Sequence, residues 1–258
     1  MSYIQVSSEN HVAVLTIDRP KALNALNSEV LGELEAAIDA LDLSDVRALI
    51  ITGSGEKSFV AGADIGEMST LTKADGEAFG KKGNDVFRKI ETLPIPVIAA
   101  VNGFALGGGN ELAMSCDIRI CSDNAVFGQP ETGLGITPGF GGTQRLARLV
   151  SPGMAKQILY TAKNIKADEA LRIGLVNAVY PLAELYAAAE KLASQIAANA
   201  PIAVRAAKKA INEGLDLPMD EAVVVEEKAF GSCFGTADQQ EGMGAFLEKR
   251  KHEPFTNK

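Results

Sequence analysis

The chain has 258 residues, of which 47% are hydrophobic, so it is long enough for one large α/β domain with a smaller appendage. Its net charge of −8 argues against non-specific binding to nucleic acid or to anionic membranes. No apolar run approaches the length of a membrane span, and the first eight residues lack the basic and apolar regions of a signal peptide, so we expect a soluble, cytoplasmic protein.

The scarcity of cysteine and histidine narrows the chemistry that is available. The cysteines, Cys116, Cys121 and Cys233, are odd in number and form no CxxC pair, which argues against a zinc site or a disulfide framework. The two histidines, His11 and His252, lie outside any glycine-rich turn, so a catalytic site built on histidine is not favoured. If the chain is an enzyme, we expect carboxyl groups to carry its proton transfers.

Strands and helices alternate in the first part of the chain. Short apolar runs predict strands at 12–17 and 48–52, the first of them paired with 4–7. Between these strands, apolar positions at helical spacing predict a helix that begins near Ser28. A second helix is marked by Phe79, Gly83, Val86, Phe87 and Ile90. The apolar stretch 96–101 then reads as a fully buried strand.

Three consecutive glycines, Gly107 to Gly109, follow that buried strand, and a helical pattern opens at Asn110. Glycine lets the backbone adopt strained angles and lie directly against a ligand. The first amides of a helix lack internal partners and favour negative charge. This turn is therefore suited to hold a developing oxyanion beside the carboxylate of Glu111. The structural alternative is that the glycines only let a helix pack closely on a sheet.

The same pattern occurs once earlier in the chain. A strand that ends at Gly53 leads through a loop to Ala61-Gly62-Ala63-Asp64, as the strand before Gly103 leads to the three glycines. Two successive strand–turn–helix units would place the two turns side by side, and each turn would supply one amide. Any repeated strand–helix pattern produces a similar echo, so this observation alone does not separate the two interpretations.

Glu131 is the second candidate acid, and it follows short strands expected at 118–121 and 126–127. This interval lets Glu111 and Glu131 reach one cavity from separate turns. Two carboxyl groups around one water act as an acid–base pair, because mutual repulsion lets one of them keep its proton. The structural alternative is that Glu131 is one of many solvated surface carboxylates.

The remainder of the chain becomes helical. After a glycine-rich loop at 133–142, we expect a helix from Ser151-Pro152, a helix at 167–173, a strand at 175–179 and a helix through 182–196. Three helices at 201–215, 219–234 and 236–251 follow, the last opened by a capping box of Thr236 and Gln239. We therefore divide the chain into a core, residues 1–200, and a helical region, 201–258. The many apolar side chains of this helical region predict that it packs on a neighbouring subunit. Packing on its own domain is the open alternative.

Three segments, 59–65, 102–111 and 127–144, together resemble the signature of the crotonase superfamily, and within it the enoyl-CoA hydratases. The resemblance extends from 19–24 to 245–250. It implies an α/β fold, the crotonase (ClpP-like) spiral of ββα repeats, with a C-terminal helical trimerisation region. It also implies a homo-oligomer, usually a hexamer made of two trimers.

The resemblance carries site residues onto this sequence by motif. It implies an oxyanion hole from the backbone N–H groups of Ala63 and Gly108, catalytic roles for Glu111 and Glu131, and a water-positioning role for Gly139. The implied CoA contacts are Lys21, Ala22, Leu23, Ala61, Asp64, Ile65 and Gly66, with Phe246 and Lys249 reaching the CoA of a neighbouring subunit. Two positions depart from the family pattern: many hydratases have a basic residue at the position of Gly66 and a cysteine at that of Asn110.

The implied reaction is the reversible syn addition of water to a short-chain 2-trans-enoyl-CoA, with CoA as part of the substrate and no separate cofactor or metal. An enoyl-CoA isomerase is one alternative, although isomerases generally manage with a single carboxylate. A non-catalytic acyl-CoA- or RNA-binding homologue is another, which the acidic charge and the glutamate pair disfavour. A nucleotide-binding protein would require a GxGxxG or GxxxxGK motif, and neither occurs. The physiological direction, fatty-acid oxidation or butyrate-type fermentation, stays open.

Overall fold

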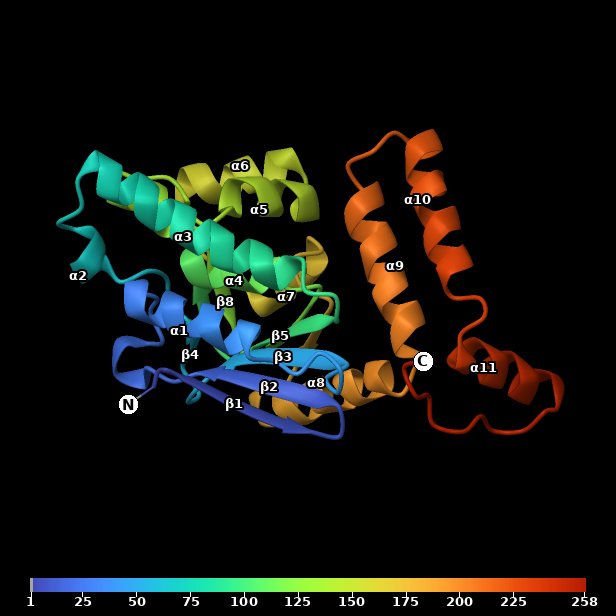
Figure 1. Ribbon diagram of the computed structural model, residues 1–258. Helices are drawn as coiled ribbons and strands as arrows, with labels where there is room; N and C mark the ends of the chain where they lie inside the picture. The colour runs from blue at the N-terminus through green and yellow to red at the C-terminus, as the bar shows by residue number, and fades with distance from the viewer. Residues whose placement is uncertain (1) are drawn as a thin grey trace.

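The computed structural model describes residues 2–258, and its strands form two sheets (Figure 1). The larger sheet contains, in spatial order, β1 (Ile4–Glu9), β2 (Val12–Ile17), β3 (Ala48–Gly53), β5 (Val97–Val101), β7 (Ile118–Ser122) and β10 (Ala178–Tyr180). The smaller sheet contains β4 (Ser58–Val60), β6 (Phe104–Leu106), β8 (Val126–Gly128) and β9 (Ile165–Lys166). The expected pairing of the first two strands is confirmed, since β1 and β2 are antiparallel neighbours.

Three successive units explain why there are two sheets. In the pairs β3–β4, β5–β6 and β7–β8, the first strand joins the larger sheet and the second joins the smaller one, before the chain continues into helices. Glycine permits the close passage between the two sheets. A Cβ added to Gly53 would lie 2.3 Å from the Phe59 carbonyl oxygen, and one added to Gly103 would lie 2.3 Å from that of Lys57. This ββα repeat accounts for the echo in the sequence.

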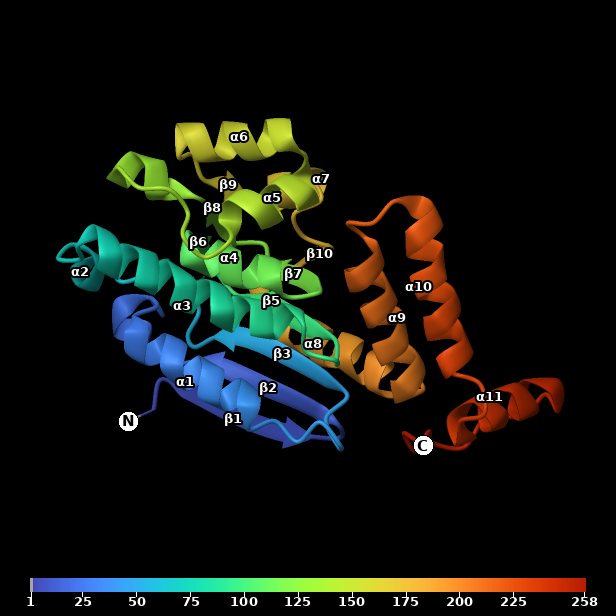
Figure 2. The ribbon, with the colours of Figure 1, turned by 45° about the horizontal axis from the view of Figure 1, so that its top comes forward.

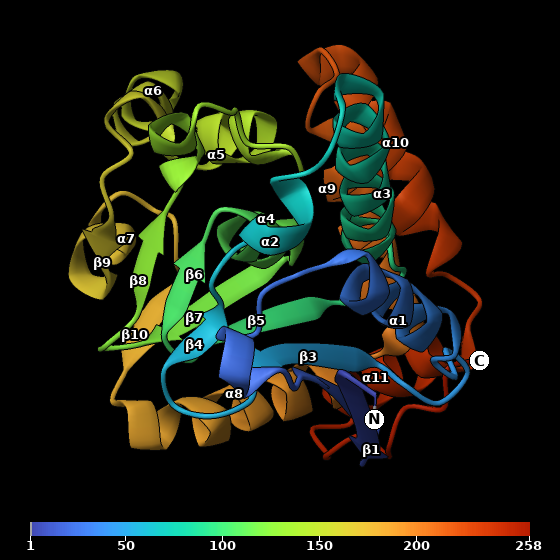
Figure 3. The ribbon, with the colours of Figure 1, turned by 90° about the vertical axis from the view of Figure 1, so that its left-hand side faces the viewer.

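Helices cover both faces of the larger sheet (Figures 2 and 3). On one face, α8 buries small and apolar side chains against Ile50 and its neighbours, while Leu49 and Ile51 of the same strand point to the core on the other face. The helices of the core are α1 (Ser28–Asp39), α2 (Ile65–Met68), α3 (Lys73–Glu91), α4 (Gly108–Ser115), α5 (Gly142–Val150), α6 (Pro152–Thr161), α7 (Ala167–Arg172) and α8 (Leu182–Ala197), with 3-10 helices η1 (Pro20–Ala22) and η2 (Pro130–Leu134).

The α3 prediction is confirmed in detail, because the five positions expected to face the core are its buried residues. Other boundaries need correction. Helix α4 begins at Gly108 instead of Asn110, and α5 occupies residues 142–150, where no helix was predicted. The strand expected at 175–179 is wrong in position: β10 begins at Ala178, because the amides of Leu175 and Val176 bond back to Ala170 at the end of α7.

Three further helices, α9 (Pro201–Gly214), α10 (Met219–Ser232) and α11 (Ala237–Leu247), project to one side of the sheets (Figure 1). The buried Nζ of Lys208 fixes α9 to the core by donating to Asp117 Oδ2 at 2.7 Å and to the Ile95 carbonyl at 2.9 Å. Helix α10 contains no buried residue.

Two caps differ from expectation. Thr236 accepts a hydrogen bond from the Gln239 amide, but the Gln239 side chain accepts one from Gly235 instead of from the amide of Thr236, so only half of the capping box forms. Ser151 precedes α6 without any side-chain cap, since its backbone has a φ of +84° that turns it out of the usual capping geometry. Among residues 2–258, no helix combines the length and apolarity that a bilayer crossing requires.

Candidate active site

A cavity of about 970 Å³ opens where the smaller sheet meets α3 and the glycine-rich loop before α5. Its walls come from the turn after β4, from α2 and α3, from the turn before α4, and from η2 with the loop that follows it. The residues singled out from the sequence that line it are Ala61, Ala63, Ile65, Gly108, Glu111, Glu131 and Gly139. The cavity therefore gathers both candidate acids and both candidate amide donors.

The turns that carry Ala63 and Gly108 lie side by side because β4 and β6 pair in parallel. Gly109 permits this contact: a Cβ there would lie 1.9 Å from the Val60 carbonyl oxygen. Within residues 2–258, the amides of Ala63 and Gly108 donate no hydrogen bond, and both residues line the cavity. Two unpaired N–H groups on one cavity wall are available to an oxygen of a bound molecule.

Glu111 lies in the first turn of α4 and is 1% exposed. Its Oε1 accepts hydrogen bonds from the amides of Phe140, at 2.9 Å, and Gly142, at 2.7 Å. Burial raises the pKa of Glu111 to about 7, although these two amides and the charge of Arg145 oppose the rise. Because the backbone bonds use Oε1, the other oxygen is available to a molecule in the cavity.

Glu131 is held by η2 and is also buried. Burial, followed by the negative charge of Glu111, raises the pKa of Glu131 to about 7. The amide nitrogen of Gln129, when turned toward this carboxylate, lies 2.9 Å from Oε1 and 3.1 Å from Oε2. Gln129 is fully buried, and no spacing in the sequence distinguished it from other polar residues.

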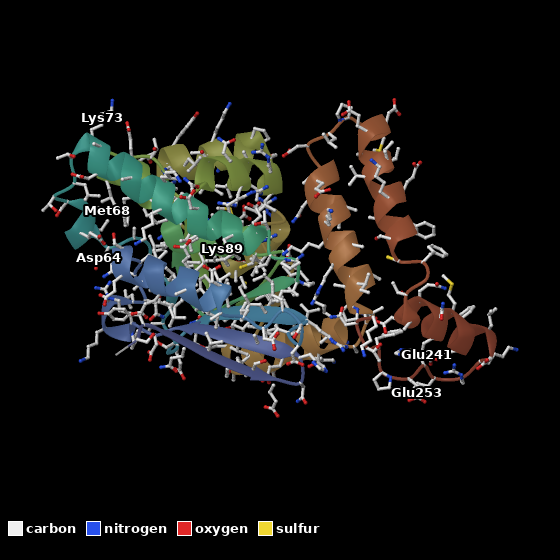
Figure 4. All side chains as sticks on the ribbon, viewed as in Figure 1. Asp64, Met68, Lys73, Lys89, Glu241 and Glu253 are labelled. Atoms are coloured by element: carbon white, nitrogen blue, oxygen red, sulfur yellow. The ribbon has the colours of Figure 1, made fainter. Side chains whose placement is uncertain are left out.

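The remaining predicted contacts do not line the cavity. Residues 21–23 lie next to its first turn, since the Leu23 carbonyl accepts the Ala61 amide. Asp64 caps α2 and pairs with Arg19 at 2.8 Å, with Gly66 following it. Phe246 belongs to α11 and Lys249 follows that helix. Figure 4 shows Asp64 at one side of the molecule and Glu241 of α11 at the other. The roles predicted for all these residues stay predictions.

One wall of the cavity is aromatic. Phe140 packs edge-on against Phe79 and Phe87 of α3, with ring centroids 5.2 and 5.6 Å apart. A Cβ on Gly83 would lie 2.2 Å from the Phe140 ring, and one on Gly108 would lie 3.2 Å from it. The ring is thus fixed between α3 and the turn that carries the Gly108 amide. No role was predicted for Phe140 from the sequence.

The chain is similar to known proteins along nearly its whole length. Residues 7–258 match the family model described as enoyl-CoA hydratase/isomerase. The chain is 60% identical to the short-chain-enoyl-CoA hydratase of Clostridium acetobutylicum, covering 100% of this chain and 99% of that protein. It is 59% identical to the crotonyl-CoA hydratase of Syntrophomonas wolfei, covering 96% of each. The crystal structure of an enoyl-CoA hydratase from Bacillus anthracis superposes with a TM-score of 0.96 at 39% identity, covering 100% of both chains.

Proposed function

The chain belongs to the enoyl-CoA hydratase/isomerase family, and we propose that it catalyses the reversible syn addition of water to short-chain 2-trans-enoyl-CoA thioesters, forming 3-hydroxyacyl-CoA. The observation that carries this proposal is the meeting of two buried glutamates and two unpaired amides in one cavity. An isomerase that shifts a double bond needs only one such acid, so the second carboxyl group favours hydration.

In this mechanism, the amides of Ala63 and Gly108 receive the thioester oxygen. They withdraw electron density from the conjugated double bond, so that C3 becomes electrophilic and negative charge develops on the oxygen. Glu111 takes a proton from a water molecule while the oxygen of that water bonds to C3. Glu131 supplies a proton to C2. The negative charge on the thioester oxygen is lost at the same time, as the C=O double bond re-forms. At this point Glu111 holds the proton from water and Glu131 has lost one, so a proton must pass from Glu111 to Glu131 before the next turnover. With that return, one water supplies the hydroxyl on C3 and, in net terms, the hydrogen on C2.

The division of roles follows from the surroundings of the two carboxyl groups. Two backbone N–H groups donate to Glu111, which stabilises its ionised form and suits it to act as the base. Glu131 faces the negative charge of Glu111, which favours retention of its proton and suits it to act as the acid. Gly139 lies in the loop whose amides donate to Glu111, and we propose that it helps to place the water. The reaction then needs no separate cofactor.

We also propose that the enzyme prefers short acyl chains such as crotonyl-CoA, because relatives at 59–60% identity are named short-chain-enoyl-CoA and crotonyl-CoA hydratases. The ring of Phe140, which lines the cavity beside Gly108, is the side chain that we propose limits acyl length. CoA itself would lie along residues 21–23, Ala61 and 64–66. The unpaired thiols of Cys116, Cys121 and Cys233 fit a reducing compartment, which supports a cytoplasmic location.

The direct test is a rate series over acyl length. The enoyl-thioester absorbance of crotonyl-CoA is expected to disappear on addition of the protein, and kcat/KM is expected to fall as the acyl chain grows. In Phe140→Ala, the longer chains should gain relative to crotonyl-CoA, because a bulky ring that lines the cavity is removed. If no 2-enoyl-CoA loses its absorbance, the proposed activity is wrong. A flat chain-length profile in the unmodified protein would overturn only the short-chain part.

We propose in addition a homo-oligomer, with a hexamer of two trimers as the expected form. Apolar side chains along α10 and α11 support it, since Phe230 is 67% exposed, Phe246 83% and Leu247 79%, a density that is unusual on a free surface. In such an assembly, Phe246 and Lys249 would reach the CoA bound to a neighbour. Sedimentation velocity is expected to give six times the chain mass of 27.1 kDa. A monomer at micromolar concentration would contradict this proposal, and Phe230→Glu should dissociate the assembly.

A further inference from the structure

The loop that donates to Glu111 is itself held from outside the cavity. Asn84 Nδ2 of α3 donates to the Gly139 carbonyl at 2.8 Å, and Arg145 Nη1 of α5 donates to the Phe140 carbonyl at 2.8 Å. The peptides between residues 139 and 142 therefore point their carbonyls outward and two of their amides inward. Gly141 makes this arrangement possible, with a φ of +97° and a position where a Cβ would lie 2.2 Å from Arg145 Nη1.

Arg145 is in turn fixed by a charge on another helix. Its Nη2 lies 3.0 Å from Glu91 Oε2 near the end of α3, and Glu91 also accepts from Arg88 at 2.9 Å. The Arg145 side chain is 12% exposed, and its buried Nε–H has no acceptor within residues 2–258. An unpartnered buried donor costs free energy. The ion pair with Glu91 and the hydrogen bond to the Phe140 carbonyl nevertheless fix the guanidinium directly behind the loop.

We propose that Arg145 is a positioning residue for the reaction: by holding the Phe140 carbonyl, it aims the amides of Phe140 and Gly142 at Glu111 Oε1 and so keeps Oε2 free for the water. This inference rests on the proposed hydratase function. Arg145 does not line the cavity, so it acts through the loop and through Glu111 instead of through the substrate.

Arg145 also contributes its charge. The ionisable groups around Glu111 are Glu131 from η2, which disfavours a second negative charge, and Arg145 from α5, which favours one. Around Arg145 itself lie Glu91 on α3 and the Cys116 thiol, whose pKa burial raises to about 12 so that it stays uncharged. Within the described part of the chain, loss of Arg145 would remove the positive charge that opposes the rise in the pKa of Glu111. Glu111 must be ionised to act as the base. In a protein without Arg145, the fall in activity on acidification would therefore begin at a higher pH than in the unmodified protein.

The test compares Arg145→Gln with Arg145→Lys in the crotonyl-CoA assay. For Arg145→Gln, we expect kcat to fall roughly 10- to 100-fold, the size of effect that a displaced catalytic group produces. KM should change little, and the acidic limb of the pH–rate profile should move to higher pH. Arg145→Lys keeps the charge and one hydrogen bond, so it should recover part of kcat and most of the original pH profile.

Arg148→Gln is the matched control, because Arg148 lies on the same helix, is about half exposed and pairs with Asp216 at the surface. It should leave kcat, KM and the pH profile unchanged. The inference is overturned if Arg145→Gln is folded and retains both kcat and the acidic limb, or if its kcat falls without any movement of that limb. An inactive unmodified protein would instead refute the proposed function, so the two failures are distinguishable.

Discussion

Glu131→Gln is expected to lower kcat for crotonyl-CoA hydration by roughly 10³–10⁴-fold, the upper part of the range for loss of a general acid. The amide has nearly the same shape as the carboxyl group, so the cavity should keep its form. It has no proton of suitable acidity to give to C2, and it removes the group whose pKa is raised to about 7. Binding of the product 3-hydroxybutyryl-CoA, measured by calorimetry, should change little because the amide donors remain in place.

Glu184→Gln is the control for this exchange, since Glu184 lies in the first turn of α8, outside the cavity. It should hydrate crotonyl-CoA at the unmodified rate. A Glu131→Gln protein that retains near-normal turnover would show that the acid has been assigned to the wrong residue. A protein that loses product binding as well as turnover would show that Glu131 organises the pocket instead of transferring a proton.

Replacement of Gly108 by proline is expected to lower kcat by about 10²–10³-fold, because it deletes one of the two N–H donors aimed at the thioester oxygen. Position 108 is the first residue of α4, where a helix accepts proline most readily. The loss should appear in kcat more than in KM, since the charge that the amide stabilises develops as the reaction proceeds. Steady-state rates with crotonyl-CoA measure both parameters.

Gly108→Ala separates the lost donor from added bulk. It keeps the N–H group and adds a methyl 3.2 Å from the Phe140 ring, so it introduces bulk at this position without deleting the donor. Its kcat should therefore stay well above that of the proline variant. Equal losses in the two variants, with unchanged thermal melting, would attribute the effect to crowding of the pocket and count against an oxyanion role for Gly108.

Sequence reasoning was most successful where local pattern determines structure. The apolar positions of α3 repeat at helical spacing, and the similar turns after Gly53 and Gly103 were recognisable as an echo in the sequence. That the chain changes sheets at these two glycines was not predicted. Glu111 and Glu131 could be paired because each follows a short strand of the repeating unit. Their catalytic roles were carried over from the family resemblance and stay predictions, and the Glu131→Gln exchange tests the role of Glu131.

Residues that reach the site through tertiary contacts were not predictable in this way. Gln129, Phe140 and Arg145 have no distinctive spacing, and their importance follows from the partners that folding brings to them. Helix α5 escaped notice because it starts at Gly142, and glycine at a helix start looks like a loop in the sequence. The position of β10 depended on bonds from residues 175 and 176 to the end of α7, a competition that apolar character alone does not report.

The parallel pairing of β4 with β6 sets the spacing between the turns that carry the Ala63 and Gly108 amides. Adjacent strands in a sheet stand about 4.8 Å apart. Two N–H groups that share one oxygen at about 2.9 Å each must lie closer together than about 5.8 Å. The lateral repeat of the smaller sheet therefore already matches the gap that such donors need, without adjustment by any side chain. Insertions upstream of either strand should leave this spacing unchanged. One extra residue between a strand and its turn would instead move one N–H donor out of hydrogen-bond distance of the shared oxygen.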